Sequence, residues 1–355
     1  MGDTLTNSMK ALQLSKYKQL DLVDLPIPRP GSGEVLVRVA ACGICGSDVH
    51  GYDGSSGRRI PPIVMGHEAS GVVAATGNGV TELSEGDRVT FDSTIYCGTC
   101  PYCLRGQVNL CDQRKVLGVS CSEYRCNGAF ADYVTVPERI IYRLPDMLSY
   151  ADAAMLEAVS VAVHGVSLSH VASGETALVL GAGMIGLLTL QALRAAGCSR
   201  VFIADVDGSR LELAKTLGAT TALQASGSEL ISEILQLTNG EGVDVAVEAV
   251  GINATVRTAV GCARKGGRVT LVGNSSPEVT LPLQLVVSRQ IRLQGSCASA
   301  GEYPKAIELV ASGTIKVKPL ITAVVPLEEG PKWFARLHAG EPNLMKVVLT
   351  PGAIS

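Results

Sequence analysis

The stretch that decides the fold is Ala177-Leu178-Val179-Leu180-Gly181-Ala182-Gly183-Met184-Ile185-Gly186. An apolar run precedes the G-x-G-x-x-G pattern and a longer apolar segment follows it, which predicts a buried strand, a glycine turn and a helix. In such a turn the first glycine allows a tight bend, the second lets the backbone approach a pyrophosphate, and the third lets helix and strand pack closely. The free N–H groups at the helix start favour phosphate. The pattern therefore predicts a dinucleotide site at Gly181, Gly183, Met184, Ile185 and Gly186.

A carboxylate suited to the ribose of this dinucleotide comes shortly afterwards. Asp205 ends the next predicted strand, 22 residues after Gly183 (205 minus 183). It can accept hydrogen bonds from both ribose hydroxyls of NAD, and it repels the 2′-phosphate of NADP. Arg210 leaves an alternative open, because an arginine nearby can bind a 2′-phosphate. Since Asp205 is present, NAD is favoured and Arg210 is expected to lie against the adenine. Val272 and Gly273, at the end of a later strand, are expected to border the same cofactor.

The alternation of strands and helices places this motif in one of two domains. Strands are predicted at 177–180, 201–204, 243–247 and 268–272, with helices at 185–196 and 210–217 and a helix capped by Ser149. This order predicts an α/β fold with a doubly wound parallel sheet. Residues 10–145 are instead β-rich, with a clear alternation at 34–39. After about residue 295 the pattern weakens, and the tail is expected to pack on the first domain. We therefore predict domains at 1–153 with 296–355, and at 154–295.

The composition excludes several classes of protein. The chain of 355 residues suits two domains, and 46% hydrophobic against 18% charged residues supports large folded interiors. A net charge of -3 without a basic run, and only 4% aromatic residues, argue against nucleic acid as a partner. No apolar stretch approaches the roughly 18–20 residues of a membrane span, so no membrane association is expected. The 11 cysteines lie at metal-ligand spacings, which predicts a reducing, cytoplasmic setting.

Four of these cysteines lie close together in the chain. Cys97, Cys100, Cys103 and Cys111 follow the spacing C-x2-C-x2-C-x7-C. A structural zinc site takes four thiolates in a tetrahedron, and short spacings let one loop wrap around the ion. The alternatives are disulfides, an iron–sulfur cluster and unligated thiols. A bacterial-type iron–sulfur run would end C-x3-C-P, whereas Asp112 follows the last cysteine here. The spacing favours a structural zinc in a lobe at about 93–115, with no position open for chemistry.

A second set of metal-ligand types is more widely spaced. Cys45 follows a predicted strand, His67 and Glu68 come further along, and Glu157 lies in the helix that enters the nucleotide-binding domain. A catalytic zinc takes three protein ligands and keeps a position for water or substrate. Each residue also has a structural interpretation: Cys45 as a small buried hydrophobe, His67 as a hydrogen-bonded histidine, Glu157 as a surface acid. His164 lies two turns after Glu157 on the same face and is an alternative ligand, although core packing is favoured for it.

Together these motifs resemble those of the zinc-containing medium-chain dehydrogenases. The stretch Gly66-His67-Glu68-Ala69-Ser70-Gly71, followed by Gly77 and Val80, is similar to the signature of that family, and the cysteine lobe, the fingerprint and the domain order match over nearly the whole chain. The resemblance implies a GroES-like catalytic domain interrupted by a Rossmann domain. Cys45-Gly46-Ser47-Asp48, with Glu157 where alcohol dehydrogenases proper carry a cysteine, resembles the polyol branch (sorbitol, L-iditol and galactitol-phosphate dehydrogenases).

The resemblance also implies roles for single residues. Glu68 is implied to bind zinc directly or in exchange with water. Ser47 matches the hydroxyl that takes the proton of the substrate, and His50 matches the outer end of that relay. Asp48 matches a partner that orients His67, which zinc-bound imidazoles usually need. The ligands and catalytic residues implied in this way are Cys45, Ser47, His50, His67, Glu68 and Glu157.

The activity implied is that of a zinc-dependent, NAD-linked oxidoreductase that takes a hydride from a secondary alcohol, a polyol or sugar-alcohol derivative, to give a ketone. Two zinc ions per chain and a homodimer or homotetramer are implied with it. One feature departs from the polyol branch. Enzymes of that branch commonly carry an Arg-Tyr pair after the strand that closes the catalytic domain, but the corresponding stretch of this chain, residues 295–303, contains no arginine. Arg125, in a longer cysteine-rich turn at 120–127, and Glu302 are candidates for substrate recognition, although surface roles are favoured. The alternatives are an amino-alcohol, sugar-acid or simple-alcohol dehydrogenase and, more remotely, a non-catalytic protein that binds NAD and zinc.

Overall fold

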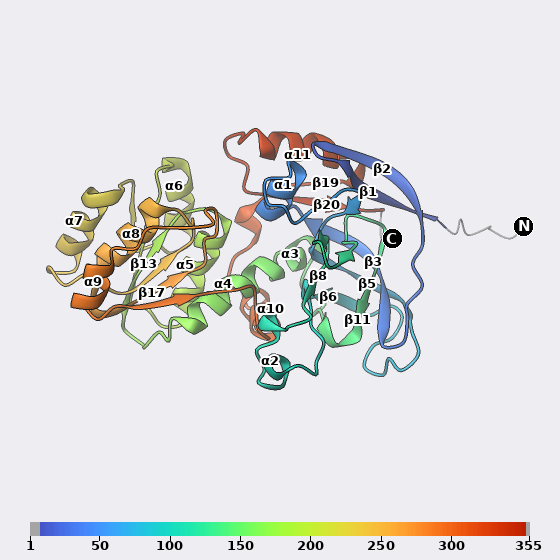
Figure 1. Ribbon diagram of the computed structural model, residues 1–355, viewed down its shortest axis with the longest axis horizontal. Coiled ribbons are helices and arrows are strands. Elements are labelled where there is room, and N and C mark those ends of the chain that lie inside the picture. Colours follow the sequence, from blue (N-terminus) through green and yellow to red (C-terminus); the bar gives the residue numbers. More distant parts are fainter. Residues whose placement is uncertain (1–7, 353–355) are drawn as a thin grey trace, which may run out of the picture. The chain divides into compact units, whose positions relative to one another are not determined.

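The computed structural model describes residues 8–352, which divide into two compact units: residues 8–157 with 320–352, and residues 158–319 (Figure 1). The predicted boundary had assigned 296–319 to the first domain, whereas this stretch lies in the second unit. Its hydrogen bonds explain the difference. Lys316 N donates to Gln191 Oε1 at 2.8 Å, and Glu302 Oε1 lies 2.7 Å from His164 Nδ1. Both partners belong to helices of the second unit, so the stretch is fixed there.

The first unit is built on a seven-stranded sheet, in the order β12-β6-β5-β3-β20-β19 with β11 also paired to β3. β3 can serve three neighbours because β11 takes its first half and β20 its last two residues, on the edge opposite β5. The predicted alternation at 34–39 is confirmed as part of β3. The strands are β3 (Glu34–Gly43), β5 (Glu68–Thr76), β6 (Arg88–Phe91), β11 (Tyr133–Pro137), β12 (Ile141–Arg143), β19 (Ile321–Pro326) and β20 (Lys346–Thr350).

Smaller elements complete this unit. A three-stranded sheet has the order β2-β1-β4, and two hairpins pair β7 with β8 and β9 with β10. The strands are β1 (Ser8–Lys16), β2 (Gln19–Pro26), β4 (Ile63–Val64), β7 (Thr94–Ile95), β8 (Lys115–Val116), β9 (Val119–Ser120) and β10 (Arg125–Cys126). The helices are α1 (Gly46–Tyr52), α2 (Pro101–Leu104), α3 (Tyr150–Ala154) and α11 (Gly330–His338), with short 3₁₀ turns η1 (Val108–Leu110), η2 (Glu138–Ile140), η3 (Lys318–Leu320, entered from the second unit) and η4 (Leu327–Glu329).

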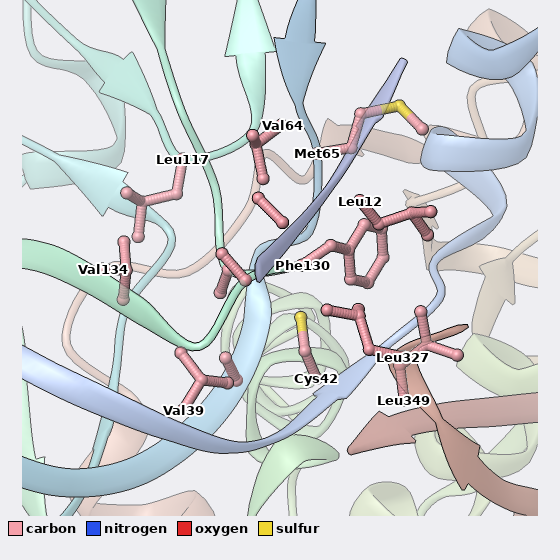
Figure 2. Close-up of a cluster of buried hydrophobic side chains, with 14 of the residues drawn as sticks. Leu12, Val39, Cys42, Val64, Met65, Leu117, Phe130, Val134, Leu327 and Leu349 are labelled. Carbon is pink, nitrogen blue, oxygen red and sulfur yellow. The ribbon is translucent and has the colours of Figure 1, made fainter. Parts of the chain in front are cut away.

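The core of the first unit lies between the two sheets. Figure 2 shows side chains from β1, β3 and β20 converging with Phe130, which precedes β11. Phe130 is fully buried and meets Phe334 of α11 edge to face, with ring centroids 5.7 Å apart. Cys42 is fully buried in the same cluster, as a small hydrophobic residue is expected to be. The strands that carry the functional residues are therefore anchored in a close-packed interior.

The predicted helix after Ser149 begins as expected and then divides. Ser149 caps it, because its hydroxyl accepts a hydrogen bond from Asp152 N at 3.1 Å. At Met155 the N–H bonds to Asp152 O, three residues back, which tightens the turn and ends α3. A second helix, α4 (Leu156–Leu168), then continues into the second unit. Glu157 therefore lies in the first turn of α4, where its position is set by both helices.

The second unit contains a six-stranded parallel sheet in the order β15-β14-β13-β16-β17-β18. The order of the strands runs outward in opposite directions from β13 and β16, which are neighbours at the centre of the sheet. This strand order is that of a doubly wound fold, and it confirms the predicted fold class. The strands are β13 (Thr176–Leu180), β14 (Arg200–Ala204), β15 (Thr221–Leu223), β16 (Val243–Glu248), β17 (Ala263–Leu271) and β18 (Arg292–Gly295). The helices are α5 (Met184–Ala195), α6 (Gly208–Thr216), α7 (Gly227–Leu237), α8 (Asn253–Cys262), α9 (Leu283–Ser288) and α10 (Tyr303–Ala311).

None of the helices within residues 8–352 combines the length and the apolar character needed to span a lipid bilayer.

Candidate metal and cofactor sites

Strand pairing brings Cys45, His67 and Glu68 together. Gly43 at the end of β3 pairs with Glu68 at the start of β5, so the residues that follow β3 meet the residues that begin β5. Gly66 turns the chain into His67 with φ at +92°, and a Cβ there would lie 2.7 Å from the ring of Phe130. Only glycine fits both conditions. One ligand atom from each of Cys45, His67 and Glu68 lies within 4.8 Å of the others, a spacing that fits a metal ion.

Asp48 of α1 fixes the orientation of the imidazole. Its carboxylate is fully buried, and Oδ1 lies 3.3 Å from Nδ1 of His67. Burial alone would raise the pKa of Asp48, but the neighbouring His67 and the Arg59 guanidinium hold that pKa far below its usual range. With Nδ1 directed at this carboxylate, Nε2 is the nitrogen left for a metal. The implied role of Asp48 as the partner of His67 agrees with this geometry.

Glu68 belongs to the cluster and is also paired with a cation that no sequence motif indicated. Its Oε2 pairs with Nζ of Lys346, and both side chains are sealed from water. Lys346 Nζ also donates to Ile44 O at 3.0 Å. Lys346 is the first residue of β20, and β20 pairs with the end of β3. A lysine at the start of a strand is ordinarily exposed to solvent, so nothing in the neighbouring sequence indicated that Lys346 is buried and paired with Glu68.

Glu157 faces the same cluster without belonging to the tight group of three. Ser93 Oγ donates to Glu157 Oε1 at 3.4 Å. Burial raises the pKa of Glu157 to about 7, the neighbouring His67 lowers it and the nearby Glu68 raises it. These interactions show that the Glu157 carboxyl lies near enough to His67 and Glu68 for their charges to act on it.

The remaining sequence candidates have other partners. His164, considered as an alternative ligand, is paired with Glu302 inside the second unit and is not in the metal-type cluster. Glu302 is therefore not the surface residue that was favoured, because its side chain is only 16% exposed and its Oε2 also accepts from Ala300 N at 2.5 Å. Arg125 is exposed, as favoured, and its guanidinium donates to Pro62 O. Ser47 and His50 lie exposed on α1.

The four-cysteine lobe forms a compact sulfur cluster. The Sγ atoms of Cys97, Cys100, Cys103 and Cys111 lie within 4.8 Å of one another, and none is in a disulfide. The N–H groups of Thr99 and Cys100 donate to Cys97 Sγ at 3.4 and 3.3 Å. These bonds lower the pKa of the Cys97 thiol to about 6, which favours the thiolate that binds metal. The cluster can hold one ion and, with four sulfurs, leaves no position for a substrate.

The glycine fingerprint has the geometry of a phosphate-binding turn. Gly181 has φ at +96°, and Gly183 caps α5. A Cβ on Gly186 would lie 1.8 Å from Gly181 O, so this glycine permits the close approach of helix and strand. A Cβ on Gly183 would meet nothing within 4 Å, so the backbone there borders open space, as the close approach of a pyrophosphate requires. Met184 and Ile185 lie between Gly183 and Gly186, in the first turn of α5.

The carboxylate end of the cofactor site is organised by its own hydrogen bonds. Asp205 follows β14, and its Oδ2 accepts from Ala182 N at 2.6 Å, which links it to the glycine turn. Arg210 lies in α6, with Nη1 4.0 Å from Asp205 and Nε 3.3 Å from Asp207. Its guanidinium is thus held by two carboxylates. Val272 and Gly273 follow β17 at the same edge of the sheet, where both N–H groups donate to Glu248 O.

Comparison with known proteins places these features in a family. Residues 31–146 match the model of the alcohol dehydrogenase GroES-like domain, and residues 185–312 match that of the zinc-binding dehydrogenases. The chain is 34% identical to the sorbitol dehydrogenase of Bacillus subtilis over 355 residues, 99% of each chain. It is 38% identical to the L-idonate 5-dehydrogenase of Vitis vinifera over 319 residues, 88% of this chain and 86% of that one. A zinc-binding dehydrogenase from Sinorhizobium meliloti bound to NADP has a TM-score of 0.88 at 32% identity, covering 97% and 99% of the two chains.

Proposed function

The chain belongs to the family of zinc-binding dehydrogenases, and from this we propose that it oxidises a secondary alcohol, a polyol or sugar-alcohol derivative, to a ketone with NAD as hydride acceptor. The observation that carries the proposal is the cluster of Cys45, His67 and Glu68 with Glu157 beside it, in a chain that also has the fingerprint and Asp205. Three such ligands leave one position of a tetrahedral ion for an alcohol oxygen.

Cys45, His67 and Glu157 would hold the catalytic zinc, with Glu68 in exchange. A zinc ion held by these residues would act as a Lewis acid and would lower the pKa of a bound alcohol toward neutrality. Lys346 keeps Glu68 engaged, which favours Glu157 as the lasting oxygen ligand. The lobe of Cys97, Cys100, Cys103 and Cys111 would hold a second, structural zinc, giving two ions per chain.

The proton of the alcohol leaves through α1. Ser47 is exposed at the start of this helix and would take the hydroxyl proton, with His50 one turn further on at the outer end of the relay. Asp48 points inward from the same helix and holds His67. Positions 47, 48 and 50 on one short helix thus separate two tasks: proton movement on the exposed side and orientation of a metal ligand on the buried side.

The cofactor proposal rests on Asp205. Asp205 directly follows β14, and its carboxylate lies beside the glycine turn, where it is suited to two ribose hydroxyls. The relative from Sinorhizobium meliloti holds NADP. We expect Asp205→Ala to weaken NAD binding and to narrow the preference for NAD over NADP, measured as the ratio of kcat/KM for the two. Glu212→Ala is the control, because this exposed side chain of α6 pairs with Lys215 and not with Asp205 or Arg210. An unchanged ratio in Asp205→Ala would contradict the ribose role.

A substrate screen tests the reaction. Initial rates of NADH formation are measured with sorbitol, xylitol and other polyols, with sugar acids such as L-idonate, with L-threonine and with short simple alcohols. Polyols are expected to give the highest kcat/KM. The sugar acids are the second candidates, because one of the relatives is an L-idonate dehydrogenase. Short alcohols that far outpace every polyol would contradict the substrate class. One zinc per chain by metal analysis, together with no NAD reduction on any alcohol, would favour a non-catalytic protein that binds NAD and zinc.

The assembly and location of the protein are proposed separately. β18 is the last strand of its sheet, and α9 beside it exposes apolar side chains, with Leu283 63% and Val287 71% exposed. An open edge with an apolar neighbour suits pairing with a second copy, so we propose a homodimer or homotetramer. The cysteines at metal-ligand spacings favour a reducing setting, and on that ground we propose a cytoplasmic location. Light scattering of the purified protein at several concentrations tests the assembly, and a monomer at micromolar concentration would contradict it.

A further inference from the structure

A buried arginine touches both functions of α1. Arg59 lies in the loop between α1 and β4, and it is only 4% exposed. Its Nη2 donates to Ser47 Oγ at 3.1 Å and to Asp48 Oδ1 at 3.0 Å. Asp48 Oδ1 in turn lies 3.3 Å from His67 Nδ1. One nitrogen therefore joins the serine of the proton relay to the carboxylate that orients a metal ligand.

The surrounding chain is built to hold this side chain. A Cβ on Gly51, in the last turn of α1, would lie 2.5 Å from Cγ of Arg59 and 2.9 Å from its Cδ, so the glycine leaves room for the arginine stem. The backbone on each side is tied to Ser120 of β9. Ser120 N donates to Arg58 O at 3.1 Å, and Ile60 N donates to Ser120 Oγ at 2.7 Å. Both the stem and the backbone of Arg59 are therefore fixed before any ligand binds.

The charge has one specific counterpart. Asp48 is the carboxylate that neutralises Arg59, since both are buried and their ion pair measures 3.0 Å. Within the part of the chain that the structure describes, the Nε of Arg59 is buried without a hydrogen-bond partner. A buried donor left unpaired is costly. The guanidinium keeps its contacts to Ser47 and Asp48 although its Nε then lacks a hydrogen-bond partner. We take this as a sign that these two contacts determine the position of the guanidinium.

We propose that Arg59 is a positioning residue of this dehydrogenase, which sets the Ser47 hydroxyl and the Asp48 carboxylate with one guanidinium group; the role in turnover rests on the proposed function. A guanidinium only donates, so Ser47 Oγ must accept from it. The second lone pair of Oγ then receives the substrate hydroxyl proton while the Ser47 O–H bond releases its own proton outward. The hydride leaves the same substrate carbon for NAD, and Arg59 keeps its protons throughout.

Two substitutions separate the two contacts. Arg59→Met removes both. Arg59→Lys carries its charge on a stem one bond shorter, so its ammonium cannot reach both partners from the same backbone and is expected to stay with the charged Asp48 and to leave Ser47. Arg58→Met is the matched control, because the side chain of Arg58 is exposed. The first readout needs no substrate: the rate at which a chelator removes the ion from the Cys45 cluster of the holoenzyme. The second is kcat and KM for the best alcohol from the screen. Circular dichroism checks that each variant is folded.

Arg59→Met is expected to lose the ion about 10- to 100-fold faster and to lose kcat by a similar factor with little change in KM. Arg59→Lys is expected to retain the ion as the parent protein does while kcat stays reduced. The proposal is overturned if Arg59→Met matches Arg58→Met in both readouts, or if Arg59→Lys restores kcat in full. If Arg59→Met does not fold, kcat of Arg59→Lys alone tests whether the contact to Ser47 matters for turnover. A parent protein inactive on every alcohol would refute the proposed function, whereas the chelator measurement would still test the contact to Asp48.

Discussion

The lobe of Cys97, Cys100, Cys103 and Cys111 and the cluster of Cys45, His67 and Glu68 both present metal-binding atoms within 4.8 Å, but they are assembled by different means. In the lobe, one loop supplies every sulfur, and neighbouring backbone N–H groups satisfy the thiolates. In the cluster, the atoms come from separate segments, joined by the pairing of β3 with β5. Local geometry is sufficient for the first site, whereas the second depends on the tertiary fold of the unit.

The electrostatics differ in the same way. The lobe has no buried carboxylate among its metal-binding atoms, and backbone N–H groups donate to the sulfurs of Cys97 and Cys111. The cluster and the partner of its histidine contribute two buried acids, and each acid has its own cation: Arg59 for Asp48 and Lys346 for Glu68. A buried charge needs such a partner because its desolvation is expensive. The site proposed to carry out chemistry is therefore more sensitive to distant substitutions than the site proposed to be structural.

The largest effect is expected from Cys45→Ser. Losing a ligand from the cluster removes the Lewis acid, which contributes several kcal/mol to the transition state, so kcat should fall about a thousandfold or more. Metal analysis should show one zinc fewer per chain, and NAD should still bind by fluorescence titration. Cys121→Ser, in the turn at 120–127 and outside both clusters, is the control. Retained turnover in Cys45→Ser would refute the assignment of the catalytic metal.

A smaller effect, on stability, is expected from Lys346→Met. This change leaves Glu68 buried without its cation, which should lower the free energy of unfolding by about 3–5 kcal/mol. Adding Glu68→Gln removes the stranded charge, so the double variant should recover most of the loss. Denaturant unfolding measures all three proteins, and Lys332→Met, on the exposed side of α11, is the surface control. Equal stability of the single variant and the parent would show that the ion pair contributes nothing.

The smallest effect on turnover is expected in the lobe. Cys103→Ser should remove the other zinc and lower Tm by about 5–10 °C, which corresponds to roughly 2–3 kcal/mol for a domain of this size. At 25 °C kcat should be little changed, because four sulfur ligands would fill every coordination position of the ion in the lobe and leave none for a substrate. Differential scanning calorimetry and steady-state rates measure the two quantities. A loss of kcat as large as that of Cys45→Ser would erase the distinction between the sites.

How much the sequence could reveal follows from the same contrast. The spacing of the four cysteines predicted the lobe because its geometry is local, and the glycine fingerprint predicted the turn before α5 for the same reason. Arg59 and Lys346 gave no such signal. An arginine in a polar loop and a lysine before Val347 look solvent-exposed until the fold brings them to Asp48 and Glu68.

The limits of the second domain have a similar explanation. The alternation of strands and helices predicted the parallel sheet, but not that residues 296–319 would stay with it. That outcome depends on His164 meeting Glu302 and on Gln191 meeting Lys316, contacts across 138 and 125 residues of chain. Side chains so far apart in the sequence show no periodicity that could link them.

The place of β20 beside β3 also has a consequence for synthesis on the ribosome. The sulfur lobe is complete once Cys111 has emerged, so it can capture its ion while most of the chain is still being made. Glu68 must wait for Lys346, and the entire second unit is translated in between. During that interval the nascent first unit has only five of the seven strands of its sheet, because β19 and β20 are missing, and Glu68 lacks its cation. Maturation of the site proposed for catalysis is thereby postponed to the end of translation, after the nucleotide-binding unit has had time to fold.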